Sequence, residues 1–328
     1  MASQRIEALP LAHLRSVGGG LSCMRRWGCR AHLAGWLLAL VTGACRPSVD
    51  RHPASSAGGG LRIADDAGRT VTLATPARRI VSLAPSITEL LFAIGAGDRV
   101  VGRTTWCRYP PAAAAVPVVG DGLNPSIEAI VARRPDLVVL YRSPLTQSAA
   151  PRLDALGIPT VMLRHDRLED IGRSARLLGR LTGRSAVGDS LAQALDSTLA
   201  VPPLVVDGPP PVRLAFVVWD RPPMVIGGGS YLDELAALAG GQNIFHDIGS
   251  ASATVSLETI AARDPDWIAV LTDSAPRPPA WAERAEWGVV RAVQRRHFLY
   301  LPAELFGRPS PRTPEAVTTL QRLLKAAR

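Results

Sequence analysis

The chain has 328 residues, of which 47% are hydrophobic and 20% are charged, and its formal net charge is +9. This composition excludes a disordered chain, and the length suggests about two domains of ordinary size. Lys325 is the only lysine, so nearly all of the positive charge is arginine, scattered along the sequence. A nucleic-acid-binding surface needs basic residues gathered in runs or on one face, so we expect no nucleic-acid partner.

An export signal is predicted within residues 1–44. The apolar run Ala31–Val41 follows three arginines and precedes three small residues. A basic segment, a short apolar run and small residues form a secretory signal peptide, and this run is shorter than the roughly 20 residues that a membrane span needs. Met24 lies directly before two arginines and is a more typical signal start than Met1, so we interpret residues 1–23 as a start-site artefact.

Cys45 stands directly after the small residues, which resembles the lipidation site of bacterial lipoproteins. We expect Cys45 to be acylated and to anchor the protein to a membrane in the periplasm or cell envelope. The alternatives are ordinary signal cleavage nearby and an uncleaved anchor. Residues 45–61, rich in Pro, Ser, Ala and Gly, are predicted to form a flexible tether. Cys107 is then the cysteine left over, so no intrachain disulfide is expected.

An internal repeat predicts two related lobes. The segment Ser126–Val139 (SIEAIVARRPDLVV) matches Ser256–Ala269 (SLETIAARDPDWIA), which lies 130 positions later. Each copy begins with a serine that can cap a helix and has a glutamate in the first turn. Each continues through Pro-Asp into an apolar run typical of a buried strand.

A strand and a capped helix are predicted near the start of the first lobe. The strand covers Arg79–Leu83. Ser86 and Glu89 then fit a capping box that opens a helix. Gly95 is the expected stop of that helix.

The second lobe has a matching unit. A strand is predicted at Val212–Val218, after which Ser230 caps a helix over Tyr231–Ala239. Gly240 and Gly241 end this helix. Further strands are predicted at Val100–Arg103, Thr160–Leu163 and Phe298–Leu301.

The connection between the lobes is predicted to be helical. Leu168–Ala200 has helical apolar spacing with one break at Thr182–Arg184, and a Pro-rich stretch follows it. The fold predicted is α/β, with an N-terminal lobe over 62–183, a connecting helix over 184–200 and a C-terminal lobe over 201–328. Clefts between domains are where small ligands bind, so we expect the ligand cleft there.

No catalytic or metal-binding motif is evident. The sequence has no HExxH, CxxC or GxSxG pattern, and Gly227–Gly229 lacks the lysine of a phosphate-binding loop. We read these glycines as a tight turn before the Ser230 cap. The histidines are not placed at matching strand ends, which disfavours a Mn or Zn receptor. We expect no catalytic residue and no bound metal, and an enzyme that uses the cleft is the least favoured hypothesis.

Four aromatic residues follow predicted strands and are candidates for the cleft wall. The carboxyl ends of parallel strands face the ligand crevice in such sheets. Core packing is the competing explanation for each residue taken singly, but several together favour a cleft lined by aromatic rings. They are Trp106, Tyr109, Tyr141 and Trp219.

Glu128 and Glu258 occupy the same position of the repeat. A first-turn acid on a helix is explained by the helix dipole alone. Because each lobe has one such acid, the pair also suits a two-fold symmetric partner that presents arginine or lysine.

These motifs resemble the substrate-binding proteins of ABC transporters. The resemblance covers residues 62–325 and rests on RIVSLAPSITELLFAIGAGDRVVG, the Cys-x-Tyr-Pro-Pro segment, NPSIEAIVARRPDLVV, the LGIP step and AGGQNIF. It is nearest to the cobalamin-binding type in the group with a helical backbone, which also binds haem and ferric siderophores. It implies two Rossmann-like lobes bridged by one helix over Ser185–Ala200. It also implies that Glu128 and Glu258 dock on a permease dimer that works with an ATPase.

The same resemblance implies ligand-contacting positions. Pro85 matches a loop position that touches corrin, and Trp106 and Tyr141 stand where the cobalamin type has aromatic residues. Glu304 and Arg308 approximate an acid and an arginine of the pocket wall in the second lobe. Where the cobalamin type has a further tryptophan, this chain has Gly-Leu-Asn at residues 122–124. Trp219 is the candidate to take over the role of that tryptophan.

The expected ligand is cobalamin or a related corrinoid, and the expected state is a monomer. Haem or a ferric siderophore is the alternative. Haem binding would require an axial ligand to the iron, for which the candidates are Tyr109, Cys107 and Tyr141. Binding of an anionic ferric siderophore would require cationic side chains near the pocket. The candidates are Arg103, Arg108, Arg142 and Arg221.

Overall fold

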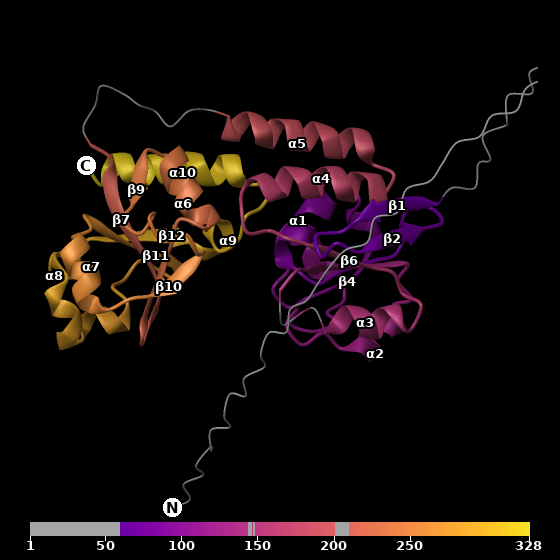
Figure 1. Ribbon diagram of the computed structural model, residues 1–328, viewed down its shortest axis with the longest axis horizontal. Coiled ribbons are helices and arrows are strands. Elements are labelled where there is room, and N and C mark those ends of the chain that lie inside the picture. Colours follow the sequence, from indigo (N-terminus) through magenta and orange to yellow (C-terminus); the bar gives the residue numbers. More distant parts are fainter. Residues whose placement is uncertain (1–59, 144–145, 147, 201–209) are drawn as a thin grey trace, which may run out of the picture. The chain divides into compact units, whose positions relative to one another are not determined.

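Two separate β-sheets, each with its own hydrophobic core, organise the chain (Figure 1). The computed structural model describes residues 60–143, 146, 148–200 and 210–328. The predicted export signal, Cys45 and the tether up to residue 59 lie outside these residues. Both sheets fall within one compact unit of the chain.

The first sheet is parallel, with four strands covered by helices on both faces. One face packs against α1 and α4, and the other against α2 and α3. A two-stranded hairpin, β1 (Leu61–Ala64) with β2 (Thr70–Leu73), precedes it. The strands in spatial order are β4 (Val100–Arg103), β3 (Ile80–Ser82), β5 (Leu137–Tyr141) and β6 (Thr160–Leu163). The helices are α1 (Pro85–Ala93), α2 (Ile127–Ala132), α3 (Ala149–Asp154) and α4 (Glu169–Leu181), with 3₁₀ turns at Gly97–Arg99 and Pro111–Ala115.

The second sheet is mixed. Its parallel part, β9, β7, β11 and β12, repeats the plan of the first sheet, and β8 and β10 add antiparallel pairs. The strands are β7 (Val212–Asp220), β8 (Pro223–Ile226), β9 (Gly241–Asn243), β10 (Ser252–Thr254), β11 (Trp267–Thr272) and β12 (Phe298–Pro302). The helices are α6 (Tyr231–Leu238), α7 (Leu257–Arg263), α8 (Arg291–Gln294), α9 (Ala303–Phe306) and α10 (Thr313–Ala326), with 3₁₀ turns at Ala280–Glu283 and Ala285–Val289.

The connection between the sheets is a pair of helices. α4 ends at Leu181, and α5 (Ser185–Leu199) packs along it after the predicted break. Glycines permit the close approach, because a Cβ at Gly188 would lie 2.5 Å from the Ala175 carbonyl oxygen. Helices α4 and α5 and the break between them lie where the helical spacing predicts them, while the lobe bounds at residues 183 and 200 stay predictions. Among the described residues, no helix has the length and apolar character needed to cross a membrane.

The sequence repeat is also a structural repeat. Ser126 caps α2 and Ser256 caps α7, each accepting a hydrogen bond from a backbone N–H three residues later. After each helix the chain turns through a left-handed residue, Arg134 with φ 47° and Asp264 with φ 45°. Two residues later in each copy, Asp136 or Asp266 accepts hydrogen bonds from backbone N–H groups at the start of β3 or β7.

The predicted capping box of the first helix is wrong. Pro85 occupies the first helical position, so the cap is Ala84, which has no side chain to cap with, and Ser86 lies inside the first turn. The Ser86 hydroxyl instead bonds to His165, and Glu89 is buried against two arginines. The predicted Ser230 cap of α6 is confirmed, because its hydroxyl accepts from the Leu232 N–H.

Candidate ligand-binding site

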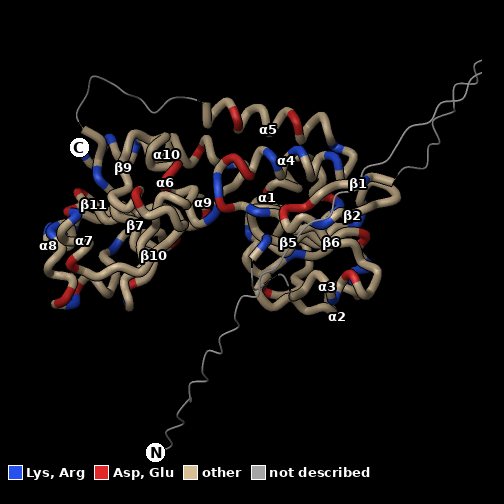
Figure 2. The backbone as a smooth tube through the Cα atoms, in the orientation of Figure 1, with Lys and Arg blue, Asp and Glu red and all other residues tan. Residues whose placement is uncertain are grey.

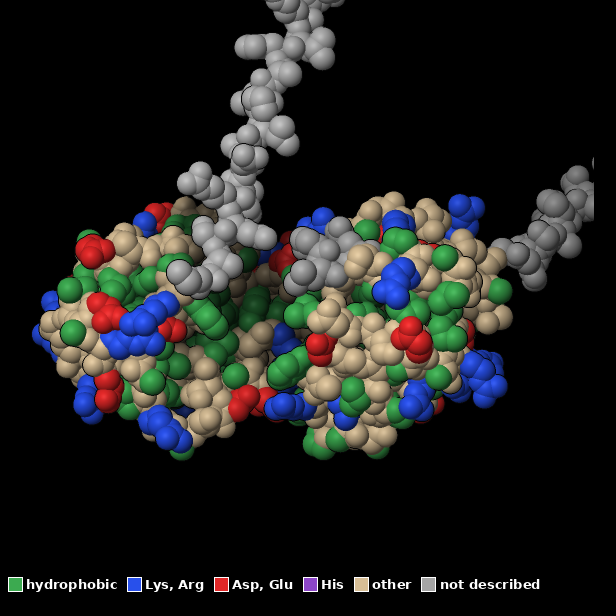
Figure 3. Space-filling model, turned by 90° about the horizontal axis from the view of Figure 1, so that it is seen from below, with side chains coloured by type: hydrophobic (Ala, Val, Ile, Leu, Met, Phe, Trp, Pro, Cys, Tyr) green, Lys and Arg blue, Asp and Glu red, His purple; other side chains and the backbone are tan. Residues whose placement is uncertain are grey.

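A cavity of about 520 Å³ lies between the two lobes. In the space-filling view, hydrophobic side chains line a hollow there (Figure 3). The first lobe contributes the segments after β3, β4, β5 and β6, and the second lobe contributes the start of α6 and a loop after α9. The lining residues are Leu83–Ser86, Thr104, Trp106, Asp121–Leu123, Tyr141, Thr146, His165, Asp166, Ser230, Tyr231, Ala251 and Gly307–Pro309.

Four of the residues predicted to contact ligand line this cavity. Pro85 lies at the start of α1, Trp106 follows β4 and Tyr141 ends β5. Arg308 lines the cavity from the second lobe. Trp106 and Tyr141 thus lie at the crevice, where the strand-end rule places them, and their contact with a ligand stays a prediction.

Three other candidates do not line the cavity. Tyr109 lies in a separate cleft, with the Arg312 guanidinium carbon 3.9 Å from its ring centroid. Trp219 is 61% exposed because β7 continues past Val218 into a hairpin with β8, so the residue sits within a strand rather than after one. Glu304 lies in the first turn of α9, where its N–H donates to Asp273.

The glycines before α6 form the predicted tight turn, in which the Ser230 N–H donates to the Gly227 carbonyl oxygen at 3.3 Å, and they also permit close packing. None of the three has a positive φ. A Cβ at Gly228 would lie 2.0 Å from the His246 carbonyl oxygen, so the loop lies directly against the backbone of residues 246–251. This packing positions Ser230 and Tyr231 at the cavity.

His165 lines the cavity, and the expectation that no histidine lies at such a strand end is wrong. It follows β6 by two residues, so the rule applied to the aromatic residues identifies it as well. Its Nδ1 lies 2.6 Å from the Ser86 hydroxyl and its Nε2 lies 2.9 Å from the Ser174 hydroxyl. Burial lowers the pKa of His165 to about 4, so the ring is neutral at physiological pH.

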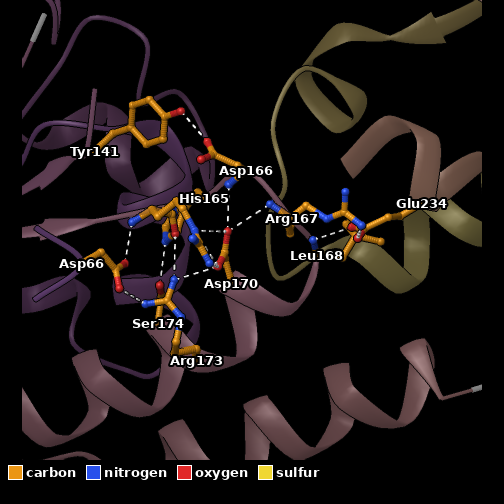
Figure 4. Close-up of polar contacts among 11 residues, drawn as sticks. Asp66, Tyr141, His165, Asp166, Arg167, Leu168, Asp170, Arg173, Ser174 and Glu234 are labelled. Carbon is orange, nitrogen blue, oxygen red and sulfur yellow. Dashed lines mark hydrogen bonds and ion pairs between the residues drawn. The ribbon is translucent and has the colours of Figure 1, made fainter. Parts of the chain in front are cut away.

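Asp166 was also missed, and it joins the cavity to the lobe connection (Figure 4). The Tyr141 hydroxyl donates to Asp166 Oδ1 at 2.6 Å. Burial and this carboxylate raise the pKa of Tyr141, which keeps the phenol protonated. The Asp166 carbonyl accepts from the Tyr231 N–H of the second lobe.

The segment around Asp166 is fixed from both lobes. Asp170 Oδ2 accepts the backbone N–H groups of Asp166 and Arg167. Burial alone would raise the pKa of Asp170, but hydrogen bonds from Arg164, Arg173 and these N–H groups outweigh it and lower the pKa to about 2. From the second lobe, Glu234 lies 2.5 Å from Arg167 Nη2 and accepts the Leu168 N–H.

Arg308 is paired across the lobes with a buried carboxylate. Glu89 Oε1 accepts from Arg308 Nε at 2.8 Å, and Oε2 accepts from Arg312 Nε at 3.0 Å. The Glu89 side chain is 1% exposed. Asp121 and Asp166 are the other residues with a formally charged side chain among the described lining residues, so the formal charge of the cavity wall is more negative than positive.

Residues 80–305 match the model of the periplasmic binding protein family. The chain belongs to this family. It is 28% identical over 252 residues to the vitamin B12-binding protein of Vibrio cholerae, covering 77% of this chain and 91% of that protein. The crystal structure of the periplasmic vitamin B12 binding protein of Vibrio cholerae aligns with a TM-score of 0.64 at 28% identity, over 77% of this chain and 98% of that one.

Two further relatives extend the comparison. The periplasmic haem-binding protein of Roseiflexus sp. RS-1, in its apo form, aligns with a TM-score of 0.65 at 25% identity, over 76% of this chain and 98% of that one. An uncharacterised ABC transporter substrate-binding lipoprotein of Bacillus subtilis is 28% identical over 268 residues, 79% of this chain and 84% of that protein. The chain is therefore an extracytoplasmic substrate-binding protein of the ABC importer class, not an enzyme, and its two-lobed α/β fold confirms the prediction.

Of the residues considered for haem or a siderophore, Tyr141 lines the cavity of this binding protein and the others do not. Arg103 bonds to three backbone carbonyls, and Arg221 pairs with Glu286. Cys107 is fully buried beside the Thr104 hydroxyl. Arg108 and Arg142 are exposed. Among the described residues, no group of three His, Cys, Asp or Glu side chains is arranged to hold a metal ion.

The candidate docking acids of the binding protein are exposed at the starts of α2 and α7. Their own backbone N–H groups, together with Ser126 and Ser256, lower the pKa values of Glu128 and Glu258, so both carry a full negative charge at neutral pH. Basic and acidic residues are otherwise interspersed over the described part of the chain (Figure 2).

Proposed function

We propose that this binding protein captures cobalamin or a related corrinoid and delivers it to the permease of an ABC importer. The observation that carries the proposal is the character of the cavity wall: apolar and aromatic, with two carboxylates and an arginine that is already paired. Similarity to the Vibrio cholerae vitamin B12-binding protein supports the same ligand class.

A corrinoid matches this wall chemically. Its flat macrocycle offers apolar faces to Trp106 and Tyr141. Its rim bears amide groups, whose N–H donors suit Asp121 and Asp166. A whole corrinoid is larger than 520 Å³, so we expect it to extend through the mouth of the cavity, where Trp106 and Leu123 are each 56% exposed.

Haem is the alternative, favoured by the likeness to a haem-binding protein. The side chains at the cavity argue against it. Tyr141 is held as a phenol by Asp166, and both ring nitrogens of His165 are hydrogen-bonded to serines. The carboxylates of the wall would also repel the two propionates of haem and the acidic groups of many siderophores.

Calorimetric and absorbance titrations of the purified protein with cyanocobalamin, haemin and a ferric hydroxamate test the proposal. We expect saturable one-to-one binding of cyanocobalamin and a rise in Tm. Binding of haemin with a shifted Soret band, without binding of cyanocobalamin, would overturn it.

Two exposed tryptophans provide a matched pair of variants. Trp106 and Trp219 are 56% and 61% exposed, but Trp106 alone of the two lines the cavity. We expect Trp106→Ala to weaken cyanocobalamin binding by about 10- to 100-fold, as for loss of an aromatic contact at a binding hot spot. Trp219→Ala is the control and keeps the wild-type Kd. A larger loss for Trp219→Ala contradicts this placement of the ligand.

Glu128 and Glu258 are proposed as the two acids that dock on the permease dimer. Glu128→Gln with Glu258→Gln should leave ligand affinity unchanged but reduce stimulation of the ATPase in reconstituted vesicles. Full stimulation by the double variant would contradict the assignment.

Cys45 is proposed as the lipid anchor. The protein should partition with membranes, and Cys45→Ala should release it, which fractionation and intact-mass measurement can detect. We also propose a monomer, which sedimentation tests.

A further inference from the structure

We propose that Glu89 is a specificity-determining residue: it neutralises the cavity arginine across the two lobes and so disfavours anionic ligands. The inference rests on the proposed function in taking the cavity as the ligand site. It adds the group that decides which charge of ligand the site accepts.

The geometry makes Glu89 the charge partner of Arg308. One carboxylate oxygen faces Arg308 Nε at 2.8 Å and the other faces Arg312 Nε at 3.0 Å. Glu89 is 1% exposed, and the two arginine side chains are 18% and 14% exposed. Ion pairs with this little solvent are weakly screened, so the carboxylate offsets the charge that Arg308 would otherwise present to the cavity.

The second arginine is directed away from the cavity. Arg312 lies against the Tyr109 ring and donates from Nη2 to the Glu304 carbonyl oxygen at 2.6 Å. Arg308 lines the cavity, and its Nη2 atom is buried with no hydrogen-bond partner among the described residues. Arg308 therefore keeps a donor without a partner, while its charge is offset by Glu89.

The second lobe contains a glutamate, Glu234, that is comparable to Glu89. It serves as a control that distinguishes an effect on ligand preference from the structural effect of losing an interlobe carboxylate. PSITEL in α1 and SYLDEL at the start of α6 align Glu89 with Glu234, which are the fifth residue of α1 and the fourth residue of α6. Each glutamate reaches a group outside its own lobe, since Glu234 contacts Arg167 and the Leu168 N–H at the connection. Only Glu89 of these two contacts a side chain that lines the cavity. A change in ligand preference is thus expected for Glu89 and not for Glu234.

Glu89→Gln and Glu234→Gln form the test. Each removes one interlobe carboxylate with almost no change of shape. Cyanocobalamin serves as the probe with no net charge and haemin as the anionic probe, with Kd measured for the whole protein. We expect Glu89→Gln to raise the affinity for haemin relative to that for cyanocobalamin by at least about 10-fold, since Arg308 is then uncompensated. Glu234→Gln should leave that ratio as in the wild type.

An unchanged ratio in folded Glu89→Gln, or an equal change in Glu234→Gln, would overturn the inference. If Glu89→Gln does not fold, Arg308→Gln decides, because removing the cation should shift the ratio in the opposite direction. A wild-type protein that binds haemin but not cyanocobalamin would refute the proposed function alone, and the rise in haemin affinity would still decide the role of Glu89. Binding of neither probe would contradict both.

Discussion

The two lobes start from the same local plan and use it differently. Both have a serine-capped helix, a left-handed turn and an aspartate that ties the helix end to the first strand. In the first lobe the strands end at the cavity, and the segment after each strand lines it. In the second lobe β7 extends to Asp220 and pairs with β8, so its tip carries Trp219 away from the cavity. Helix caps and turns in the sequence therefore predict the repeat. The length of each strand decides whether the loop that follows it faces the cavity.

The largest effect that tests this equivalence comes from the repeated core. Ile130 and Ile260 occupy the same repeat position and are both fully buried, in different clusters. Ile130→Ala and Ile260→Ala should each lower the free energy of unfolding by about 2–5 kcal/mol, because each leaves a cavity in a packed core. Urea unfolding of the two variants measures this. If the substitution in one lobe lowers the free energy of unfolding by less than about 1 kcal/mol, the two lobes are not equivalent in packing.

A smaller effect distinguishes the lobes by pH. His165 in the first lobe is buried with a pKa of about 4, whereas the His246 side chain in the second is 75% exposed beside Asp233. An unfolded histidine binds a proton below pH 6.5, so between pH 6.5 and 4 protons favour the unfolded state and stability falls as the pH is lowered. The loss from His165 reaches about 3 kcal/mol by pH 4.

One variant assigns that pH dependence. His165→Gln should flatten the profile of unfolding free energy between pH 6.5 and 4. The carboxylate of Asp170, with its pKa lowered to about 2, acts below this range: its stabilisation is present above pH 3.8 and is lost as the pH falls towards 2. A wild-type slope in His165→Gln would show that another group titrates there.

Most of the fold could be predicted because it depends on local signals. Strands β4 and β6 have the predicted bounds, and the break between α4 and α5 lies at the predicted glycine. Gly95 and Gly240 end their helices with positive φ, as a glycine stop requires. The failure at Ser86 is also local, since a proline at the first helical position moved the cap by two residues.

The site could be predicted only in part, because partners distant in sequence complete it. Trp106 and Tyr141 follow from the strand-end rule, and His165 follows from the same rule applied to a polar residue. Glu89 could not be assigned from sequence, since its arginines lie more than 200 residues away. Asp166 acquires its role from a helix of the other lobe that packs on it.

The smallest effect tests the repeated turn itself. Arg134 has φ 47°, a conformation that costs a residue with a Cβ about 1 kcal/mol relative to glycine, and its side chain is exposed. Arg134→Gly should therefore raise the free energy of unfolding by about 0.5–1 kcal/mol, measured by urea unfolding. Asp264→Gly relieves the same strain but loses the ion pair with Arg291, so its gain should be smaller. A gain at Asp264 that equals the gain at Arg134 would contradict this and would mean that the ion pair adds nothing to stability.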